Sequence, residues 1–296
     1  MLEFKPLELA DKEIFKRYAK CFGYHNIEAS FANKYIWGGV MNTKLAFDGY
    51  AMYTLLKCGE KEFMIPPFFN DCDTGFSEPL KKCEEYMRKN GGPFLIKGVN
   101  KEIKARIEKD CPGRYAFIED RANFEYVYLA KDLASLAGKK YHAKRNYINR
   151  LVSSHDFEYR RYRSEDFGAC MELHEKWTRT SKNPEDGHEE RGVIERALKN
   201  LDELDLVCGV LLIDGSLEAF SVGECFGNDM AIIHIEKANA QIDGAYALIN
   251  REFVRNEWSG VRYINREEDM GIEGLRKAKL SYYPAFLIEK YDCVRA

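Results

Sequence analysis

The sequence contains neither a long apolar run nor an apolar segment at its N-terminus. No stretch of about 18 consecutive apolar residues occurs, so no membrane-spanning helix is expected. The opening residues, MLEFKPLELADKEIF, lack the apolar core of a secretory signal peptide. We therefore expect a soluble protein that works in the cytoplasm.

Cysteine and histidine show no pattern of a metal site or of an activated nucleophile. The nine cysteines are scattered singly, without a CxxC pair, so we expect reduced thiols. Four histidines stand alone in the chain, which supports neither a metal site nor a Ser-His-Asp arrangement: His155, His174, His188 and His234. His234 alternates with isoleucines in an expected strand, and we interpret it as a packed or cleft histidine rather than a base.

Charge of neither sign dominates. The formal net charge is −3, whereas a protein that binds nucleic acid over a large surface is usually basic overall. Apolar residues make up 45% of the chain and aromatic residues 13%, which is sufficient for extensive burial. Because 296 residues exceed what one core usually fills, two domains are expected.

The two halves of the chain repeat the same order of segments. Residues 3–22 match residues 158–177 at an offset of 155, and each predicts a strand followed by an amphipathic helix. A hairpin follows in each half, TLLKCGEKEFMI (54–65) and VLLIDGSLEAFSV (210–222), aligned at Gly59 and Gly215. We expect the strand Met230–Glu236 to be an addition of the second half that has no counterpart in the first.

This order of strands and helices predicts an α+β fold in each half, with a mixed, mostly antiparallel sheet flanked by helices. We expect an N-terminal domain at residues 1–130, a basic crossover helix at residues 131–155 and a C-terminal domain at residues 156–296. The polar stretch NPEDGHEERG (183–192) is interpreted as a loop over the site or as a surface turn.

The segment from Val261 to Tyr291 places charges where a helix built for packing would not. Ile272, Leu275, Tyr282 and Tyr283 form one stripe at helical spacing, in which Lys279 lies, with Arg276 at its edge. Burying an ammonium without a partner is costly, so the pattern indicates a cleft that holds an anion or a carboxylate. The alternative is that the Lys279 stem reaches solvent at the rim of the stripe.

The crossover segment repeats this anomaly. Arg145 lies among the apolar positions Tyr141, Ile148 and Val152, where we expect it to bind a carboxylate or a phosphate. The other basic residues of the segment also fit an ordinary solvated face, with Lys144 beside the apolar face and Asn146 on the opposite side.

A third segment, residues 230–256, predicts a strand ending at Glu236 and Lys237, a loop, and a helix that opens at Gly244 and Ala245. The free N–H groups and the dipole of such a helix N-terminus favour an anion. The alternative is that Asp243 caps the helix and that Gly244 only allows close packing.

Three long segments resemble one bacterial family: Tyr128 to Asn149, Glu236 to Phe253 and Tyr263 to Pro284. FANKYIWGG, from Phe31 to Gly39, also fits it. The family consists of soluble proteins similar to the C-terminal catalytic domain of phosphatidylglycerol lysyltransferase. The resemblance implies two tandem GNAT-like acyltransferase domains, as in Fem-type peptidyltransferases, with the active site in the second.

The same resemblance bears on the donor. The GNAT loop that holds the pyrophosphate of acyl-CoA follows an (R/Q)xxGx(G/A) pattern, and QIDGAY matches it at Gln241 and Gly244 but has Tyr246 at the last position. Lysyltransferase relatives take an aminoacyl-tRNA instead and need no such loop. A tRNA would then be a partner, contacted by the basic crossover segment.

These expectations together predict transfer of an acyl or aminoacyl group from acyl-CoA or aminoacyl-tRNA to an amine or hydroxyl, without a metal. The acceptor would be a small molecule, a peptide or a lipid headgroup. The candidate catalytic residues are Glu236, Glu267, Glu268 and Lys279. The candidate substrate- and anion-binding residues are Lys144, Arg145, Asn146, Lys237, Gln241, Gly244, Ala245, Arg266 and Arg276. The alternative is a catalytically degenerate tandem fold that binds an anionic ligand or RNA.

Overall fold

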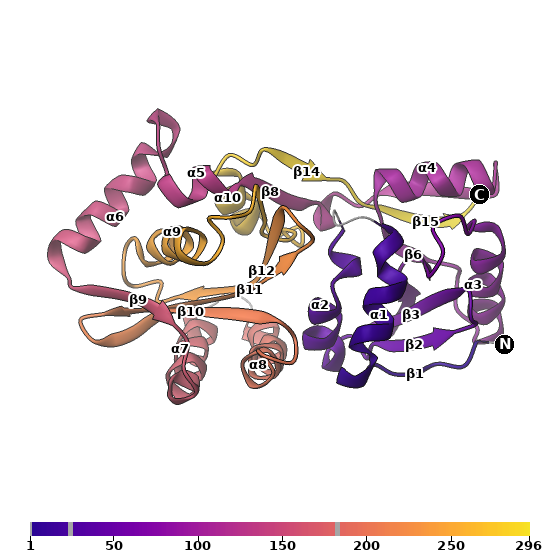
Figure 1. Ribbon diagram of the computed structural model, residues 1–296, viewed down its shortest axis with the longest axis horizontal. Coiled ribbons are helices and arrows are strands. Elements are labelled where there is room, and N and C mark those ends of the chain that lie inside the picture. The colour runs from indigo at the N-terminus through magenta and orange to yellow at the C-terminus, as the bar shows by residue number, and fades with distance from the viewer. Residues whose placement is uncertain (1, 23–25, 181–183) are drawn as a thin grey trace. The chain divides into compact units, whose positions relative to one another are not determined.

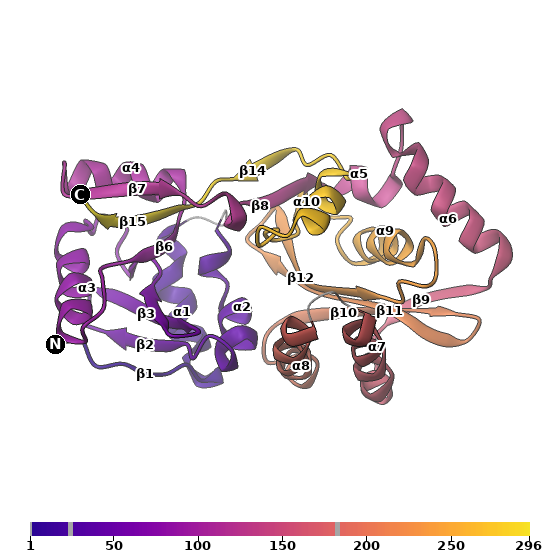
Figure 2. The same cartoon turned by 180° about the vertical axis from the view of Figure 1, so that it is seen from behind.

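The computed structural model describes residues 2–22, 26–180 and 184–296 (Figures 1 and 2). The chain forms two compact units. The first contains Met1–Glu125, Glu268–Glu273 and Leu287–Ala296, and the second contains Tyr126–Glu267 and Gly274–Phe286. Helices and a mixed sheet occur in both units, which confirms the predicted α+β class. Among the described residues no helix is long and apolar enough to cross a membrane.

The sheet of the first unit follows the order β1-β2-β3-β4-β6-β15-β7, with β5 paired to β3. Its strands are β1 (Lys5–Pro6), β2 (Lys44–Phe47), β3 (Ala51–Cys58), β4 (Lys61–Met64), β5 (Phe68–Phe69), β6 (Ile96–Val99), β7 (Tyr115–Glu119) and β15 (Tyr291–Arg295). Its helices are α1 (Lys12–Ala19), α2 (Phe31–Ile36), α3 (Ser77–Lys89) and α4 (Lys101–Asp110). Short 3-10 helices are η1 (Leu9–Asp11), η2 (Lys20–Phe22), η3 (Ile27–Ala29), η4 (Trp37–Gly39) and η5 (Arg121–Asn123).

The sheet associated with the second unit follows the order β14-β8-β13-β12-β11-β10-β9. Its strands are β8 (Glu125–Leu129), β9 (Phe157–Arg161), β10 (Leu206–Ile213), β11 (Ser216–Phe226), β12 (Met230–Ala238), β13 (Tyr263–Asn265) and β14 (Phe286–Ile288). The helices are α5 (Ala130–Ser135), η6 (Lys139–Tyr141), α6 (His142–Ser154), η7 (Ser164–Asp166), α7 (Phe167–Thr180), α8 (Pro184–Lys199), α9 (Ala245–Glu257) and α10 (Glu273–Leu280). Helices α7 and α8 lie on one face of this sheet and α9 on the other (Figures 1 and 2).

Local sequence accounts for several of these elements. The β10–β11 turn has positive φ at both Asp214 and Gly215, the geometry of a type I′ hairpin that this residue pair favours. Helix α9 buries Leu248, Ile249 and Phe253, whose spacing places them on one face of the helix. The predicted hairpin and helix are therefore confirmed.

The two sheets have the same order of pairing, including one parallel pair in each: β4 with β6, and β12 with β13. The strand that follows this pair comes from a distant part of the chain in each case. In the first unit it is β15, the last strand of the protein, and in the second sheet it is β8. The observed units therefore differ from the expected domains, which assigned residues 1–130 to one domain and residues 156–296 to the other. The boundaries differ because the apolar pattern of a strand does not show which sheet the strand joins.

The sheet orders also correct the expected register of the repeat. The prediction aligned the β3–β4 hairpin with the β10–β11 hairpin, whereas their places in the sheets equate β2–β3 with β10–β11. Strand β4 then holds the place of β12. The expectation that Met230–Glu236 has no counterpart is therefore wrong.

The predicted crossover helix at residues 131–155 is also wrong as a single helix. Helix α5 ends at Ser135, and Leu136 and Gly138 both have positive φ, a conformation that ends a helix. Helix α6 begins at His142 after the turn η6. The loop expected at residues 183–192 is replaced from Pro184 onward by helix α8, and Asn183 lies outside the described residues.

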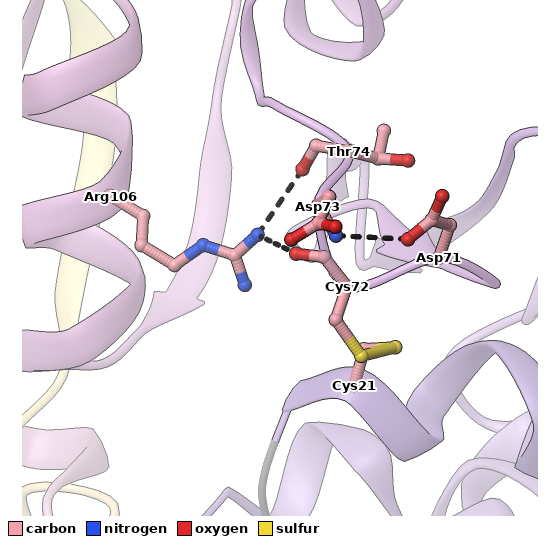
Figure 3. Close-up of a disulfide and its surroundings, with 6 residues drawn as sticks. All are labelled: Cys21, Asp71, Cys72, Asp73, Thr74 and Arg106. Atoms are coloured by element: carbon pink, nitrogen blue, oxygen red, sulfur yellow. Dashed lines mark hydrogen bonds between the residues drawn. A yellow bond between two sulfur atoms is a disulfide. The ribbon is translucent and has the colours of Figure 1, made fainter.

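The expectation of nine reduced thiols is wrong for one pair. Cys21 and Cys72 form a disulfide with a Cα–Cα distance of 5.0 Å, across a sequence separation of 51 residues (Figure 3). The other seven cysteines are free. Scattered cysteines gave no signal for this pair because its members meet only through the fold of the first unit.

Candidate functional site

The candidate site lies where strands β12 and β13 part. They run parallel and pair only at Met230–Tyr263, Ala231–Ile264 and Ile232–Asn265. Beyond these pairs the chain after β13 follows β8, since Arg266 N donates to Tyr126 O at 3.0 Å. Strand β12 instead continues along β11. Side chains from the far half of β12 and from Arg266 are thereby free to meet between the diverging strands.

A β-bulge marks the point of divergence. Residue Ile235 pairs with Val222 and Ile233 pairs with Gly223, so His234 has no partner residue on β11. A Cβ on Gly223 would lie 2.5 Å from Ile232 O, which explains the glycine opposite the bulge. Such a bulge redirects the side chains that follow it and is frequent beside active sites.

Glu236 is the centre of a buried polar group. Its Oε1 accepts from Arg266 Nη2 at 2.8 Å, and its Oε2 accepts from Asn250 Nδ2 of α9 at 3.0 Å. The Arg266 guanidinium lies 4.8 Å from the Tyr282 ring centroid and 5.7 Å from that of Tyr128. Burial alone would lower the pKa of Arg266, but the charge of Glu236 raises it overall. The two side chains are mostly enclosed, with exposed fractions of 13% for Arg266 and 11% for Glu236.

Two atoms of this group are buried and lack a hydrogen-bond partner among the described residues: Arg266 Nη1 and Asn250 Oδ1. A buried polar atom without a partner costs about 1–3 kcal/mol, so such atoms are rare in folded proteins. They belong to the two side chains that donate to the oxygens of Glu236. The site therefore offers one cationic donor and one acceptor to a ligand.

Lys144 of α6 adds a second positive charge to the group. Its Nζ lies 4.0 Å from the Tyr282 ring centroid, and among the described residues it forms no ion pair with a carboxylate. Burial is the main cause that lowers the pKa of Lys144; the charge of Arg266 lowers it further and that of Glu236 opposes both. Arg266 and Lys144 thus both contact the Tyr282 ring and both interact with the Glu236 carboxylate. Two positive side chains beside one carboxylate favour binding of a further anion.

The C-terminal end of α10 is fixed by tyrosine hydroxyls. Tyr128 donates to Lys279 O and Tyr141 donates to Tyr282 O, both at 2.9 Å. Lys279 is itself buried, and its Nζ donates to Arg266 O. The expected burial of Lys279 is confirmed, whereas its expected role as an anion ligand is not supported, because its ammonium holds the backbone of Arg266.

The predicted apolar stripe of this segment is only partly correct. Lys279 and Tyr282 are buried, but Ile272 and Tyr283 are 40% and 49% exposed. Helix α10 spans Glu273–Leu280, so Ile272 precedes it and Tyr282 and Tyr283 follow it. Helical spacing therefore does not apply to these three residues.

Arg145 does not bind a carboxylate or a phosphate as expected. Its Nη1 donates to Leu136 O and, at 2.7 Å, to Gly138 O. These carbonyls become available where α5 ends, so Arg145 stabilises the turn between the two helices. Arg145 therefore does have a partner, as the sequence pattern predicted, but the partner is the backbone and not an anion.

His234 belongs to a second buried group. Its Nδ1 lies 2.8 Å from Glu267 Oε1 and its Nε2 lies 3.1 Å from Glu224 Oε1, with the ring fully buried. Burial would lower the pKa of His234, but the two carboxylates raise it to about 9. The expectation of a packed histidine is confirmed. Glu267, a candidate catalytic residue, pairs with the His234 ring.

Lys237 lies on the opposite face of the sheet from Glu236. Its Nζ binds Glu190 of α8 at 2.7 Å and lies 3.4 Å from the Trp177 ring centroid. The structure therefore does not bring it together with Arg266.

The N-terminus of α9 is closed rather than open. Gly244 has φ of 95°, and a Cβ there would lie 2.7 Å from Tyr147 O. The Ala245 N–H, expected to bind an anion, donates to Ile242 O at 3.1 Å. Close packing at Gly244 is thus confirmed, and the N-cap is Gly244 itself instead of Asp243.

Tyr246 follows this closed turn. Burial raises its pKa to about 12, while hydrogen bonding to the Ala238 backbone and to Trp177 opposes that rise. The side chain therefore points to the end of β12, at the position where the acyl-CoA pattern requires glycine or alanine.

Two of the remaining predicted residues form local hydrogen bonds on exposed segments. Gln241 is exposed, and its backbone N–H donates to Asn239 Oδ1 at 3.0 Å. Asn146 is exposed and lies 3.3 Å from His142 Nδ1. Arg276 is half-buried on α10, and Glu268 belongs to the first unit.

Sequence reasoning named Glu236, Arg266 and Lys144, which the structure brings together, but it did not name Asn250, Tyr128 or the contact with Tyr282. A signal for Asn250 existed, because it interrupts the apolar face of α9 with a buried amide. The described residues contain no group of three or more His, Cys, Asp or Glu that could hold a metal ion.

Comparison with known proteins shows the family of the chain. The model of the C-terminal domain of phosphatidylglycerol lysyltransferase matches residues 20–294. The chain belongs to this family. A crystal structure of a conserved protein of unknown function from Bacteroides thetaiotaomicron is 36% identical, covers 100% of both chains and has a TM-score of 0.90.

Two more distant structures establish the fold. L-PGS from Bacillus licheniformis is 16% identical, with 93% of this chain and 91% of that one covered and a TM-score of 0.63. A tandem GNAT protein from the clavulanic acid biosynthesis pathway is 10% identical, with coverage of 100% and 98% and a TM-score of 0.55. The predicted tandem GNAT fold is thereby confirmed.

A curated relative covers only part of the chain. An uncharacterized protein of Mycoplasmoides gallisepticum is 26% identical over 185 residues, which is 58% of this chain and 56% of that protein. The match thus spans little more than half the length of that relative.

Proposed function

We propose that this family member transfers an aminoacyl or acyl group to an amine or hydroxyl, and that the reaction takes place between β12 and β13. The observation that carries the proposal is the buried, unpartnered Nη1 of Arg266 beside a second cation, Lys144. The matching family, that of the C-terminal domain of phosphatidylglycerol lysyltransferase, and the similarity in fold to L-PGS from Bacillus licheniformis support a transferase.

The chemistry of acyl transfer accounts for the two cations. When the acceptor attacks the carbonyl carbon of the donor, negative charge develops on the carbonyl oxygen. Arg266 Nη1 would donate to that oxygen, and Lys144, which contacts the same Tyr282 ring, would add a second positive charge. In a buried site such preformed donors lower the barrier strongly, and loss of one typically costs about 100- to 1,000-fold in rate.

Glu236 is the group placed to receive the proton that the acceptor loses. Each of its oxygens already accepts one hydrogen bond, and a carboxylate oxygen has a second lone pair available. Asn250 Oδ1 would accept from the same acceptor amine or hydroxyl and orient it. Arg266 and Asn250 therefore both hold the base and contact the substrates.

For the donor, an aminoacyl-tRNA is favoured over acyl-CoA. The packing of Gly244 against Tyr147 and the use of the Ala245 N–H within its own turn remove the donors that a pyrophosphate would require. Tyr246 departs from the acyl-CoA pattern at the same turn. The acceptor would be a small molecule, a peptide or a lipid headgroup.

The test is a transfer assay with labelled donors. Purified protein is incubated with a panel of charged tRNAs or with acyl-CoAs, together with amine and hydroxyl acceptors of the three classes. We expect transfer from a charged tRNA that Arg266→Lys slows by about 100- to 1,000-fold and that Glu236→Gln also slows. Arg160→Lys is the matched control, since Arg160 forms a two-pronged ion pair with Asp166 at 2.7 Å elsewhere in the same unit.

A second candidate function is favoured by one observation. The closed turn at Gly244 and the inward Tyr246 also fit a degenerate GNAT unit that binds an anionic ligand or RNA without catalysis. Binding of an uncharged and a charged tRNA with equal affinity, without turnover of any donor, would support this second function against the transferase.

A further inference from the structure

The disulfide of the first unit lies at the surface, between two segments that are distant in sequence. Cys21 belongs to η2, directly after α1, and Cys72 lies in the loop between β5 and α3 (Figure 3). Cys72 is exposed and Cys21 is half-buried. A small thiol or disulfide in solution can therefore reach this bond from the side of Cys72.

The loop that carries Cys72 is held in place without the disulfide. Arg106 Nη2 of α4 donates to Cys72 O and to Thr74 O, each at 3.2 Å (Figure 3). Its guanidinium also lies 5.3 Å from the Phe76 ring centroid. Inside the loop, Thr74 N donates to Asp71 O at 3.1 Å. These contacts hold the Cys72 loop to α4 independently of the disulfide.

The other cysteines of the chain do not share these properties. Five are buried, and burial raises the pKa of each of their thiols: Cys83, Cys111, Cys170, Cys208 and Cys293. Two are exposed but are not joined to a second cysteine: Cys58 and Cys225. Buried neutral thiols react slowly, and an exposed single thiol forms only mixed disulfides.

From these contacts we infer that Cys21 and Cys72 form a site of reversible covalent modification, for which the reagent is a low-molecular-weight disulfide such as oxidised glutathione. The Cys72 thiolate attacks one sulfur of the small disulfide, forming a mixed disulfide and releasing one small thiolate. The Cys21 thiolate then attacks the Cys72 sulfur and releases the second. Two protein thiols are oxidised, one small disulfide is reduced to two thiols, and the two protein protons pass to solvent and to the released thiolates.

The consequence is a covalent link that fixes the end of α1 to the β5–α3 loop only when the surroundings are oxidising. The reverse reaction begins at the exposed Cys72 sulfur and needs no unfolding, because Arg106 holds the loop independently of the bond. The inference does not depend on the proposed transfer activity.

The test uses the full chain. Reduced protein is equilibrated in buffers with graded ratios of reduced to oxidised glutathione, quenched by alkylation, and analysed by intact mass and peptide mapping. We expect the Cys21–Cys72 peptide pair to rise and fall reversibly with the ratio, with unchanged far-UV circular dichroism. Cys225→Ser is the control and should leave the titration unchanged.

Variants separate the two steps. In Cys21→Ser the cross-link is lost and glutathione accumulates on Cys72, whereas in Cys72→Ser both the cross-link and this adduct are lost. The inference is overturned if no Cys21–Cys72 peptide forms at the most oxidising ratio. It is also overturned if the formed bond resists reduced glutathione until the protein unfolds, since the bond would then be a permanent staple.

Discussion

The buried His234 between Glu224 and Glu267 predicts a specific dependence of stability on pH. The two carboxylates raise the pKa of this imidazole from 6.5 in the unfolded chain to about 9 in the folded one, against the opposing effect of burial. Each tenfold rise in proton affinity corresponds to 1.36 kcal/mol, so the rise contributes about 3 kcal/mol to the stability of the second unit.

The sign follows from the direction of the pKa. Because the folded pKa lies above the unfolded one, the contribution is complete below about pH 6.5 and is lost as the pH rises to about 9. Replacement His234→Gln removes the titrating group. The variant should therefore lose stability at about pH 6 and should lack the decline toward about pH 9.5 that the parent shows.

The assay must report on the second unit alone, since two units can unfold separately. The chain has three tryptophans, of which Trp37 lies in the first unit and Trp177 and Trp258 in the second. In a Trp37→Phe background, urea unfolding followed by fluorescence reports the second unit. His155→Gln, which replaces a histidine whose side chain is 42% exposed, is the control.

The quantity to compare is the difference in unfolding free energy between about pH 6 and about pH 9.5. This difference should be about 3 kcal/mol larger in the parent than in His234→Gln, and His155→Gln, which removes a partly exposed pair with Asp214, should change it much less. An identical pH dependence in the parent and in His234→Gln would refute the charged state assigned to this ring.

Other parts of the structure predict further changes. Lys290 is buried, with its Nζ 2.5 Å from Glu125, so Lys290→Met should destabilise the first unit by about 3–5 kcal/mol in urea unfolding, and adding Glu125→Gln should restore part of that loss. Gly244→Ala should lower the melting temperature, because its positive φ and the approach of Tyr147 O both oppose a Cβ; an unchanged value would contradict the close packing. Reduction of the Cys21–Cys72 disulfide should cost the first unit about 2–4 kcal/mol, measured by unfolding with and without reductant, and no loss would show that the link does not constrain the unfolded chain.

Local patterns in the sequence predicted much of the fold. The Asp214–Gly215 turn and the apolar face of α9 are encoded within a few neighbouring residues, and both were predicted correctly. The placement of β15 and β8 could not be predicted, because a strand pattern says which face is apolar but not which sheet receives the strand. The break after Ser135 was missed because Leu136 adopts a left-handed conformation that its residue type does not announce.

The site was predicted in part for a related reason. Glu236, Arg266 and Lys144 were among the candidate residues, and the structure brings them together. Arg145 stood out as a charge among apolar positions, yet its partners are backbone carbonyls, which every sequence contains and no sequence pattern displays. A misplaced charge thus indicates that a partner exists without indicating which kind.

The central claim is that Arg266 supplies the donor for the developing oxyanion. The direct measurement is the single-turnover rate of transfer from a charged tRNA by the parent, by Arg266→Lys and by the control Arg160→Lys. The account predicts a rate about 100- to 1,000-fold lower for Arg266→Lys, with donor binding retained, and a rate close to that of the parent for Arg160→Lys. Equal rates for Arg266→Lys and the parent would contradict it.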